Sequence, residues 1–216
     1  RDDSRDEAGL SGLIRRMSAL VVGLMSGTSL DGVDAALVSF DDDAPRCLAT
    51  HFRPYSDELR GETLSLQKPG HDELRRSLRL ANRLADLYAE TTNELLALAT
   101  VCSSEVIAIG CHGQTLLHSP AEGYSLQLNN PARLVEKTGI AVISDFRNRD
   151  LAAGGQGAPL VPAFHDAVFR VPDHHRVIAN IGGISNLTSL APGKPIKGFD
   201  CGPGNMLLDA WIARHY

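Results

Sequence analysis

The sequence predicts an α/β fold built on a mixed sheet that is flanked by helices. Short apolar segments alternate with helical patterns along the chain, as expected of βαβ units. Residues 21–38 and residues 177–190 each contain an apolar run, a loop of small residues and a second apolar run, which predicts two β-hairpins. A chain of 216 residues can hold one large or two small domains, and the repeated hairpin favours two related lobes.

The loop of the first hairpin is suited to binding an anion. Gly27 and Gly32 lie on either side of Asp31, among several hydroxyl side chains. Glycine lets the main chain approach a ligand closely, and converging backbone N–H dipoles attract negative charge. Asp31 adds an oxygen ligand of the kind that a phosphate-bound Mg²⁺ prefers. Taken alone, the loop is equally compatible with an ordinary glycine-containing hairpin, because glycine-rich loops are a weak signal.

The second hairpin repeats this pattern. When Val177 is laid over Val21, Gly183 falls on Gly27 and Ser185 falls on Ser29. Two unrelated hairpins could share these residues by chance. Two phosphate-binding loops at equivalent places would instead belong to two lobes that face one nucleotide. That layout resembles the actin-like (ribonuclease H-like) ATPase and sugar-kinase folds.

Between the hairpins, the patterns predict a third strand, a long helix and a buried strand. Residues 46–55 could add a strand to the first hairpin, and Asp72 is a suitable N-cap for a helix over residues 72–99. Residues 105–109 form a short apolar strand that ends at Gly110. The apolar stripe of the long helix has three- and four-residue spacing and consists of Leu74, Leu78, Ala81, Ala85, Tyr88, Thr92, Leu95 and Ala99.

Proline and glycine mark the elements that follow. A helix begins at Asn130 and Pro131 and ends at Gly139, because proline favours the first helical position and glycine the C-terminal end. The later elements are expected to be a strand at 140–144, a glycine-rich loop at 154–157 and a helix at 163–169 whose His165 packs or caps.

Composition and charge exclude several classes of function. The formal net charge of −5 argues against a nucleic-acid partner, because neutralising phosphates requires a basic face. Arg147 and Arg149 lie beside two aspartates and suit a sugar or phosphate pocket better than DNA. No apolar run approaches the roughly 18 residues of a membrane-spanning helix. The four cysteines show neither paired spacing nor a histidine partner pattern, so they are interpreted as reduced thiols in a cytoplasmic enzyme.

Two groups of polar residues are predicted to follow strand ends. His112, Gln114 and Thr115 come after the strand at 105–109. The strand at 140–144 is followed by Asp145, Arg147, Arg149 and Asp150. Ligands of open α/β sheets bind in the crevice outside such ends, and alternating donors and acceptors suit a polyhydroxylated ligand. Arg149 could hold a carboxylate through two hydrogen bonds. Two structural alternatives stay open: His112 as a satisfied turn histidine, and Asp145 with Arg149 as a salt bridge that only shapes a loop.

Asp200 is the candidate catalytic base. Residues 196–199 predict a strand, and Gly202-Pro203-Gly204-Asn205 then opens a helix over 206–215. This places the Asp200 carboxylate between a strand end and a helix N-terminus, which favours the ionised form that a base needs at neutral pH. The alternative is an N-cap aspartate without a catalytic role. Asp209 is a weaker candidate, because it is expected to be buried against the sheet or solvated.

Six motifs together carry a family resemblance. Residues 25–34, Met-Ser-Gly-Thr-Ser-Leu-Asp-Gly-Val-Asp, resemble the opening motif of the anhydro-N-acetylmuramic acid kinases. The five others follow in that family's order and at roughly its spacing: Gly110-Cys111-His112-Gly113-Gln114-Thr115, Asp145-Phe146-Arg147-Asn148-Arg149-Asp150, residues 154–162, Asn180-Ile181-Gly182-Gly183 and residues 198–205. Each motif alone is weak evidence, whereas six in register are strong. Asn129 departs from the family pattern, in which a glycine is common at this position.

The resemblance implies an actin-like ATPase fold and a kinase that uses ATP and Mg²⁺. Such enzymes open 1,6-anhydro-N-acetylmuramic acid hydrolytically and phosphorylate O6 to give N-acetylmuramic acid 6-phosphate, in cytoplasmic recycling of bacterial cell-wall fragments. Asp200 would deprotonate the water that attacks C1, Asn130 would join the sugar-binding residues named above, and Asp31 would bind Mg²⁺. The residues expected to bind ATP are Gly27, Thr28, Ser29, Leu30, Asp31, Gly32, Val33, Asp34, Gly182, Gly183, Asn186, Gly202, Gly204 and Asn205.

Two other classes of function stay open: another actin-fold sugar or acyl phosphotransferase, and a non-catalytic sugar-binding or regulatory module. Family members are considerably longer, so this chain is expected to be an N-terminal portion, with a first lobe over 17–170 and an incomplete second lobe over 171–216. Residues 1–16 are expected to be a disordered tail or an added segment, with Met17 as a plausible natural start. A homodimer is a further expectation, since sugar kinases of this architecture are often dimers.

Overall fold

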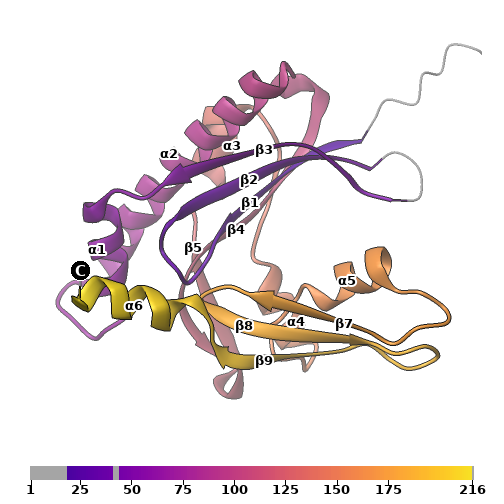
Figure 1. The fold of residues 1–216 in the computed structure, drawn as a ribbon. Helices are drawn as coiled ribbons and strands as arrows, with labels where there is room; N and C mark the ends of the chain where they lie inside the picture. The colour runs from indigo at the N-terminus through magenta and orange to yellow at the C-terminus, as the bar shows by residue number, and fades with distance from the viewer. Residues whose placement is uncertain (1–18, 41–43, 216) are drawn as a thin grey trace, which may run out of the picture.

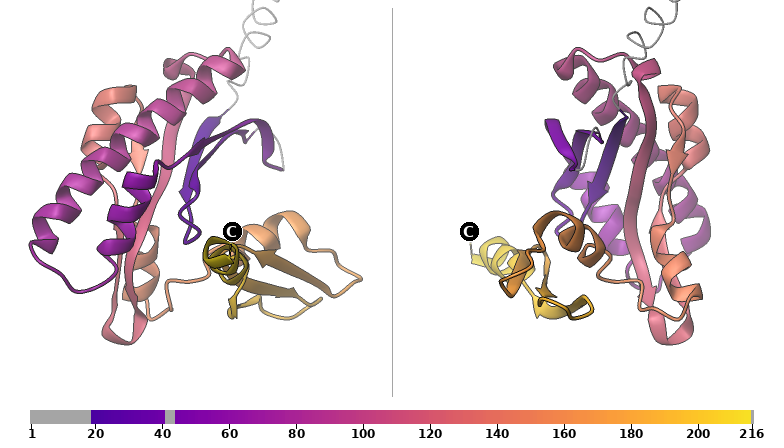
Figure 2. Two further views of the ribbon diagram at one scale, coloured as in Figure 1. Left: turned by 60° about the vertical axis from the view of Figure 1, so that its left-hand side comes forward. Right: turned by 90° about the vertical axis from the view of Figure 1, so that its right-hand side faces the viewer.

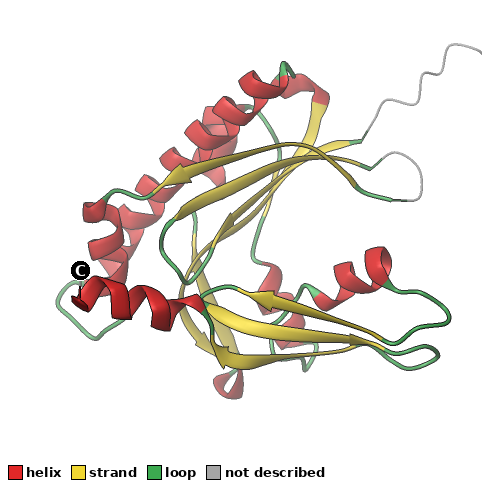
Figure 3. Cartoon of the chain, in the orientation of Figure 1, coloured by secondary structure: helices red, strands yellow, loops and turns green. Residues whose placement is uncertain are grey.

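The computed structural model describes residues 19–40 and 44–215, so the expected tail at 1–16 and the expected start at Met17 lie outside the described residues. Figure 1 shows two separate sheets, the first covered by the long helix α2 and the second carrying α5 and α6. Figure 3 shows the same arrangement by type of secondary structure. The predicted α/β class, with a mixed sheet flanked by helices, is confirmed.

The first sheet has six strands in the order β3-β2-β1-β4-β5, with β6 paired to β4. Its strands are β1 (Leu20–Ser26), β2 (Gly32–Ser39), β3 (Arg46–Pro54), β4 (Val106–Ser119), β5 (Tyr124–Leu128) and β6 (Val142–Ile143). β4 runs parallel to β1 and β6, whereas the other pairs are antiparallel. The first predicted hairpin and the third strand are therefore present, and the sheet is mixed.

One face of this sheet packs against α2 (Glu73–Ala99), with α1 (Asp57–Ser65) before it and α3 (Pro131–Thr138) beside it, as the two views in Figure 2 show. Inward side chains alternate along β1 and β2, as expected of strands with one buried face. The core they form with α2 includes Leu20, Val22, Leu24, Val33, Leu37, Leu80, Leu84, Tyr88 and Leu95. Burying each large apolar side chain stabilises the fold by roughly 1.5–3 kcal/mol.

Two expectations about α2 are corrected. Leu74 and Leu78 are 76% and 60% exposed, because the first turns of α2 extend past the sheet, and Leu80 and Leu84 are buried instead. Asp72 occupies the N-cap position, but its φ of 56° is left-handed and its side chain caps no amide. By contrast, α3 begins and ends as predicted. The side chain of Asn130 accepts a hydrogen bond from the Arg133 amide, and the chain ends the helix at Gly139 with a φ of 71°.

β4 does not end at Gly110. A 3-10 turn (Ser103–Glu105) precedes it, and the strand continues to Ser119, because its second half pairs with β5 after leaving β1. The second 3-10 turn (Pro120–Glu122) lies between β4 and β5. His112, Gln114 and Thr115 consequently lie within a strand and not beyond its end. β6 is shorter than predicted and is followed directly by α4 (Phe146–Ala152).

The second sheet is antiparallel and contains β7 (Arg176–Ile181), β8 (Ile184–Leu190) and β9 (Lys197–Pro203). The second predicted hairpin is thus present as β7 and β8. α5 (Pro162–Phe169) packs on this sheet through His165, whose buried Nδ1 lies 3.0 Å from Thr188 Oγ1, so the predicted packing role of His165 is confirmed. α6 (Asn205–His215) follows β9. No helix among the described residues is both long and apolar enough to cross a membrane.

Candidate functional site

The loop of the first hairpin is fixed by hydrogen bonds within itself and to β4. The Gly27 carbonyl accepts hydrogen bonds from the Leu30 amide (3.4 Å) and from Gln114 Nε2 (3.2 Å). Leu30 adopts a φ of 56° and turns its side chain into the core, where it is 2% exposed. The tip of the loop, Thr28 and Ser29, faces the second sheet.

The loop of the second hairpin lies directly against this tip. A Cβ added to Gly183 would lie 2.5 Å from Thr28 Oγ1, closer than real Cβ atoms approach. The amides of Gly204 and Asn205, where β9 passes into α6, donate hydrogen bonds to the Gly183 and Gly182 carbonyls (2.8 and 2.9 Å). The prediction that the two glycine loops face each other is therefore confirmed.

Asp200 lies close to Arg147, which reaches it from α4. Burial lowers the pKa of Arg147, and the Asp200 carboxylate opposes this by raising it. Arg147 also donates from Nε to His112 Nε2 (2.9 Å) and from Nη1 to the Gly157 carbonyl (2.6 Å). One guanidinium thus connects β4 to the glycine-rich loop at 154–157, within electrostatic range of the candidate base on β9.

The local position of Asp200 differs from the prediction. Asp200 lies inside β9, where it pairs with Asn186 of β8, because the strand continues to Pro203 before α6 begins at Asn205. It does not lie at the junction of strand and helix, and it is not an N-cap. Its side chain is exposed. Asp200 therefore remains available to a ligand.

His112 is held neutral at pH 7. Its Nδ1 lies 2.7 Å from the Gly113 carbonyl, which can only accept, so Nδ1 carries the proton and Nε2 accepts from Arg147. Burial, and then the charge of Arg147, lower the pKa of His112 to about 4. Because both ring nitrogens are engaged, His112 is suited to orienting Arg147 and not to removing a proton.

A polar pocket of about 220 Å³ lies beside His112, between β5 and the beginnings of α3 and α4. It brings two predicted site residues, His112 and Asp145, into one wall. Asp145 Oδ1 accepts a hydrogen bond from Asn148 Nδ2 (2.7 Å). The remaining lining residues are Ser125, Leu126, Gln127, Asn129, Pro131 and Ser144.

This pocket contains polar groups that the sequence did not indicate. Gln127 Oε1 and both side-chain polar atoms of Asn129 are buried and have no hydrogen-bond partner among the described residues. The Asn129 side chain also lies close enough to the Cys111 thiol to lower its pKa, although burial dominates and raises that pKa to about 12. The only sequence signal at Asn129 was its departure from the family pattern, and Gln127 gave none.

Gln114 and Asn130, both predicted to bind the sugar, make hydrogen bonds within the fold. Gln114 is fully buried, accepts a hydrogen bond from the Tyr55 hydroxyl (3.0 Å) and donates to the first glycine loop. Asn130 caps α3 and donates from Nδ2 to Asn82 Oδ1 (2.6 Å) on α2. The side chains of both residues are thus committed to the fold.

Of the other predicted site residues, Thr115 and Asp150 make hydrogen bonds within the fold, whereas the Arg149 side chain is exposed. Thr115 Oγ1 accepts from Gln127 Nε2 (3.3 Å), and Asp150 Oδ2 accepts from the Gly157 amide (2.7 Å), so Asp150 shapes the glycine-rich loop. Arg149 is exposed and has no hydrogen-bond or ion-pair partner in the described part of the chain, so the alternative of a salt bridge with Asp145 is not observed there. Asn148 is the partner of Asp145 instead.

Three residues of the first loop motif, Leu30, Gly32 and Val33, contribute to packing within the fold. Leu30 and Val33 are core residues, 2% and 0% exposed, so neither side chain can reach a ligand. Gly32 lies so close to β3 that an added Cβ would be 2.3 Å from the Arg53 carbonyl oxygen. The predicted part of Leu30 and Val33 in ATP binding therefore falls to their main chain.

The second loop offers unpaired amide groups. Asn186 Oδ1 and Asn205 Oδ1 are buried and have no hydrogen-bond partner among the described residues. Both lie beside the contact between the two loops, since Asn186 follows the Gly183 turn on β8 and Asn205 opens α6. Buried polar groups are normally satisfied, so these two amides indicate a place for a polar ligand.

The described residues contain no group of three or more His, Cys, Asp and Glu side chains that could hold a metal ion by itself. Asp31 and Asp34 are close enough to interact: burial raises the pKa of Asp34, and the charge of Asp31 raises it further. Mg²⁺ at phosphate sites commonly takes only one or two carboxylates and keeps waters and phosphate oxygens as its other ligands. These two aspartates fit that mode of binding and not a dedicated metal site.

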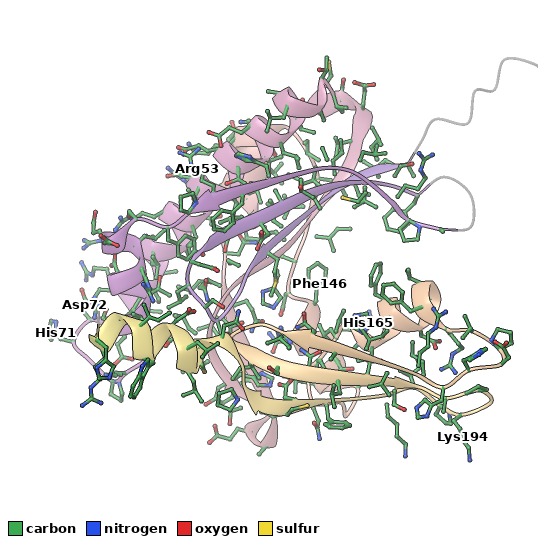
Figure 4. All side chains as sticks on the ribbon, in the orientation of Figure 1. Arg53, His71, Asp72, Phe146, His165 and Lys194 are labelled. Carbon is green, nitrogen blue, oxygen red and sulfur yellow. The ribbon has the colours of Figure 1, made fainter. Side chains whose placement is uncertain are left out.

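A second cavity, of about 350 Å³, lies on the face of the first sheet opposite the helices. Asp34, Gly23, Gly110 and His112 line it, and Phe146, labelled in Figure 4, closes one side. The cavity and the polar pocket share His112. Arg147, which binds His112, therefore stands at the centre of the candidate site.

The fold and site define an α/β protein with two sheets, two facing glycine loops and an exposed carboxylate on the second sheet. The chain belongs to the anhydro-N-acetylmuramic acid kinase family, whose model matches residues 19–216.

Relatives named anhydro-N-acetylmuramic acid kinase include those of Chromobacterium violaceum and Nitrosospira multiformis, each 56% identical over 200 residues, and that of Neisseria gonorrhoeae, 53% identical over 198 residues. These matches cover 91–92% of this chain and 54–55% of each relative. The chain therefore spans about half the length of the curated relatives that it matches.

Solved structures with some similarity include a Ppx/GppA family member from Aquifex aeolicus and an exopolyphosphatase from Cytophaga hutchinsonii. They are 12% and 13% identical, cover 89% and 88% of this chain and 54% and 53% of their own chains, and both have a TM-score of 0.40. Similarity at this level supports no statement about function.

Proposed function

We propose that this chain supplies the phosphate-binding loops and the catalytic base of a kinase that acts on 1,6-anhydro-N-acetylmuramic acid. The kinase would open the anhydro bridge with water and phosphorylate O6 with ATP, giving N-acetylmuramic acid 6-phosphate. Family membership supports this activity. The observation that carries it is the contact between the two glycine loops, with the exposed Asp200 on the strand that leads from the second loop into α6.

The reaction assigns one proton transfer to Asp200. Its carboxylate takes a proton from a water molecule, whose oxygen attacks C1 of the sugar while the bond from C1 to O6 breaks. O6 then attacks the γ-phosphorus of ATP, and ADP leaves. The positive charge of Arg147 would attract the Asp200 carboxylate, and catalysis would depend on positioning and on electrostatic stabilisation.

The two lobes would divide the substrates between them. The amides of Thr28, Ser29 and Gly183 would bind the β- and γ-phosphates, and Asn186 and Asn205 would bind other polar groups of the nucleotide. Mg²⁺, held by the phosphates with Asp31 or Asp34, would offset phosphate charge. This assignment is supported by the contact of the loops and by the unpaired amides.

The sugar would occupy the space around His112. Asp145, Gln127 and Asn129 would contact its polar substituents in the pocket, and the exposed Arg149 would bind the carboxylate of its lactyl group. Unpaired buried amides beside a neutral histidine suit a polyhydroxylated ligand, and a free guanidinium suits a carboxylate. The same pocket would disfavour an acyl phosphate substrate, which offers fewer hydroxyl groups.

The test uses the full-length protein with Mg-ATP and the anhydro sugar, followed by mass spectrometry. A product heavier by one phosphoryl group and one water is expected. Asp200→Asn should lower kcat by about 10³-fold or more while calorimetry still detects sugar binding, because the amide cannot take the proton. Asp209→Asn, on the exposed face of α6, is the matched control and should keep normal activity.

Two results would contradict the proposal. An unchanged sugar in the presence of folded protein would exclude the reaction, and near-normal turnover by Asp200→Asn would remove Asp200 from the role of base. Phosphorylation of another sugar in a substrate panel would favour a different phosphotransferase. Sugar binding without any ATP turnover would favour a binding module.

We further propose a cytoplasmic location in a bacterium and a homodimer, both on the strength of the family resemblance. The lobes are proposed to join within 153–161, earlier than residue 170, since α5 packs on the second sheet through His165. The second lobe would be completed by the half of the relatives' length that this chain does not span.

A further inference from the structure

A buried hydrogen-bond network lies directly behind the first glycine loop. Ser26, the last residue of β1, is 2% exposed, and its Oγ lies 2.7 Å from the hydroxyl of Tyr88 on α2. Tyr88 is fully buried in the middle of that helix. A contact of this kind ties the start of the loop to the helix that covers the sheet.

A second branch of the network reaches the loop through Tyr55 and Gln114. The Tyr55 hydroxyl donates to Gln114 Oε1 (3.0 Å), and Gln114 Nε2 donates to the Gly27 carbonyl (3.2 Å). The Tyr55 amide donates to the Asp31 carbonyl (2.9 Å). The Gly27 end of the loop is therefore held by the Gln114 side chain, to which the Tyr55 hydroxyl donates, and the Asp31 end by the Tyr55 backbone.

The network carries no charge at neutral pH. Burial raises the pKa of Tyr88 well above its ordinary value and also raises the pKa of Tyr55. The neighbouring Cys111 thiol, with a pKa raised to about 12, also stays protonated. Both tyrosines consequently remain hydrogen-bond donors over the physiological pH range.

The end points of these bonds distinguish the network from an ordinary polar cluster in a core. They fall on the backbone carbonyls of Gly27 and Asp31 and on the Ser26 hydroxyl, all of which belong to the loop or to the strand that enters it. The ring of Tyr88 belongs to the apolar core, whereas its hydroxyl bonds to Ser26, at the start of the loop. What the bonds fix is the conformation of residues 26–31.

We propose that Tyr88 and Tyr55 are positioning residues that hold the first glycine loop in the conformation that binds nucleotide phosphates. The inference rests on the proposed function in one respect, since it takes a nucleotide as the ligand of the loop. Neither tyrosine touches that ligand. Both act through Ser26, Gln114 and the backbone of the loop, which would otherwise have to be ordered when the nucleotide binds.

The experiment measures the affinity of the full-length protein for Mg-ADP by calorimetry, so that it does not depend on sugar turnover. Tyr88→Phe and Tyr55→Phe each remove one hydroxyl and are expected to weaken Mg-ADP binding about fivefold to tenfold, as the loss of one buried hydrogen bond would. The affinity for the anhydro sugar should stay within twofold of wild type. In hydrogen exchange, the peptide that contains residues 26–31 should exchange faster in both variants, while β7 and β8 should not change.

Thr92→Val is the matched control. Thr92 is a fully buried residue on the same helix, and its hydroxyl bonds only to the Tyr88 carbonyl within α2 (2.8 Å). This variant should lower thermal stability by an amount similar to Tyr88→Phe but leave Mg-ADP affinity unchanged. The control therefore separates a general loss of stability from a loss of loop order.

The proposal is overturned if a folded Tyr88→Phe or Tyr55→Phe protein binds Mg-ADP as tightly as wild type, or if Thr92→Val weakens binding equally. If Tyr88→Phe does not fold, Tyr55→Phe, at a half-buried position, decides the matter by the same criteria. A wild-type protein that binds Mg-ADP but leaves the sugar unchanged would refute the proposed kinase reaction and leave this inference standing. A wild-type protein that binds no nucleotide would refute both.

Discussion

His112 should make the folded protein less stable as the pH falls from 7 to 5. The neutral ring donates from Nδ1 to the Gly113 carbonyl and accepts at Nε2 from Arg147, and a proton on Nε2 would replace that acceptor with a second positive charge. The folded state therefore resists protonation, with a pKa of about 4 against an ordinary value of 6.5. In the unfolded chain, His112 has no such restraint.

The magnitude follows from these two pKa values. Above pH 6.5 the ring is neutral in both states, and His112 makes no pH-dependent contribution. Between pH 6.5 and pH 4 the unfolded state binds a proton that the folded state does not, so the free energy of unfolding falls as the pH falls. The two values predict a loss of about 2 kcal/mol between pH 7 and pH 5, and of about 3 kcal/mol once the pH is below 4.

The assay compares urea unfolding of the wild type and of His112→Gln across this range. Gln keeps an acceptor for Arg147 but does not titrate, so the difference between the two free energies of unfolding isolates His112 from the carboxylates. Carboxylates with lowered pKa values, such as Asp86 beside Arg133, lose their contribution in both proteins and cancel. His71→Gln, at an exposed histidine, serves as the control and should retain the His112-dependent slope.

A difference that stays constant within about 0.5 kcal/mol between pH 7 and pH 5 would refute the reasoning. So would an NMR titration in which the folded His112 ring gains its proton near pH 6.5. Either result would mean that the Arg147 contact does not control the protonation of His112, and it would weaken the case for Arg147 as the link to Asp200.

Two further substitutions test the glycine positions. Gly32→Ala should destabilise the first lobe by about 1–3 kcal/mol in urea unfolding, because its Cβ would lie 2.3 Å from the Arg53 carbonyl oxygen. The control Gly61→Ala, on the exposed side of α1, should be neutral or stabilise the protein by about 0.5–1 kcal/mol. Equal effects of the two substitutions would contradict the close approach of β2 and β3. Gly183→Ala should weaken Mg-ADP binding about tenfold in calorimetry, since its Cβ would meet Thr28 Oγ1 at 2.5 Å and force the loops to shift, and unchanged affinity would mean that the loop contact is irrelevant to the nucleotide.

The sequence predicted correctly those elements whose formation depends on residues close together in the chain. Both hairpins, the third strand and α3 follow the predictions because alternation, proline and glycine act over a few residues. The repeat of the hairpin also predicted that the two glycine loops face each other, and in the structure they are in contact. This success concerned the arrangement of backbone and did not depend on any particular side-chain contact.

The errors arose where segments distant in the sequence determine strand pairing and hydrogen-bond partners. Gly110 does not stop β4, because β1 and β6 pair with the strand on both sides there, and Gly113, with a φ of 76°, redirects the strand towards β5. Gln114 and Asn130 have the chemistry of sugar ligands, but the first glycine loop and α2 use their hydrogen bonds. The sequence does not show which hydrogen-bond partner the fold places beside a polar side chain.

Arg147 illustrates how the role of a residue can escape prediction. The sequence analysis assigned both arginines of the motif to a sugar or phosphate pocket, but it gave a specific contact, with a carboxylate, to Arg149 alone. Selecting Arg147 would have required knowing that α4 places it between His112 and Asp200. Likewise, the unpaired amides of Gln127 and Asn129 can be recognised only when the walls of the pocket are in place.

The neutral state of His112 links stability to the proposed chemistry. A neutral ring accepts a hydrogen bond from Arg147 without competing for its charge, so the guanidinium charge remains available to the Asp200 carboxylate. A protonated ring would repel Arg147 and loosen the connection between α4 and β4. Because the folded ring gains its proton only near pH 4, this connection should persist across the physiological pH range.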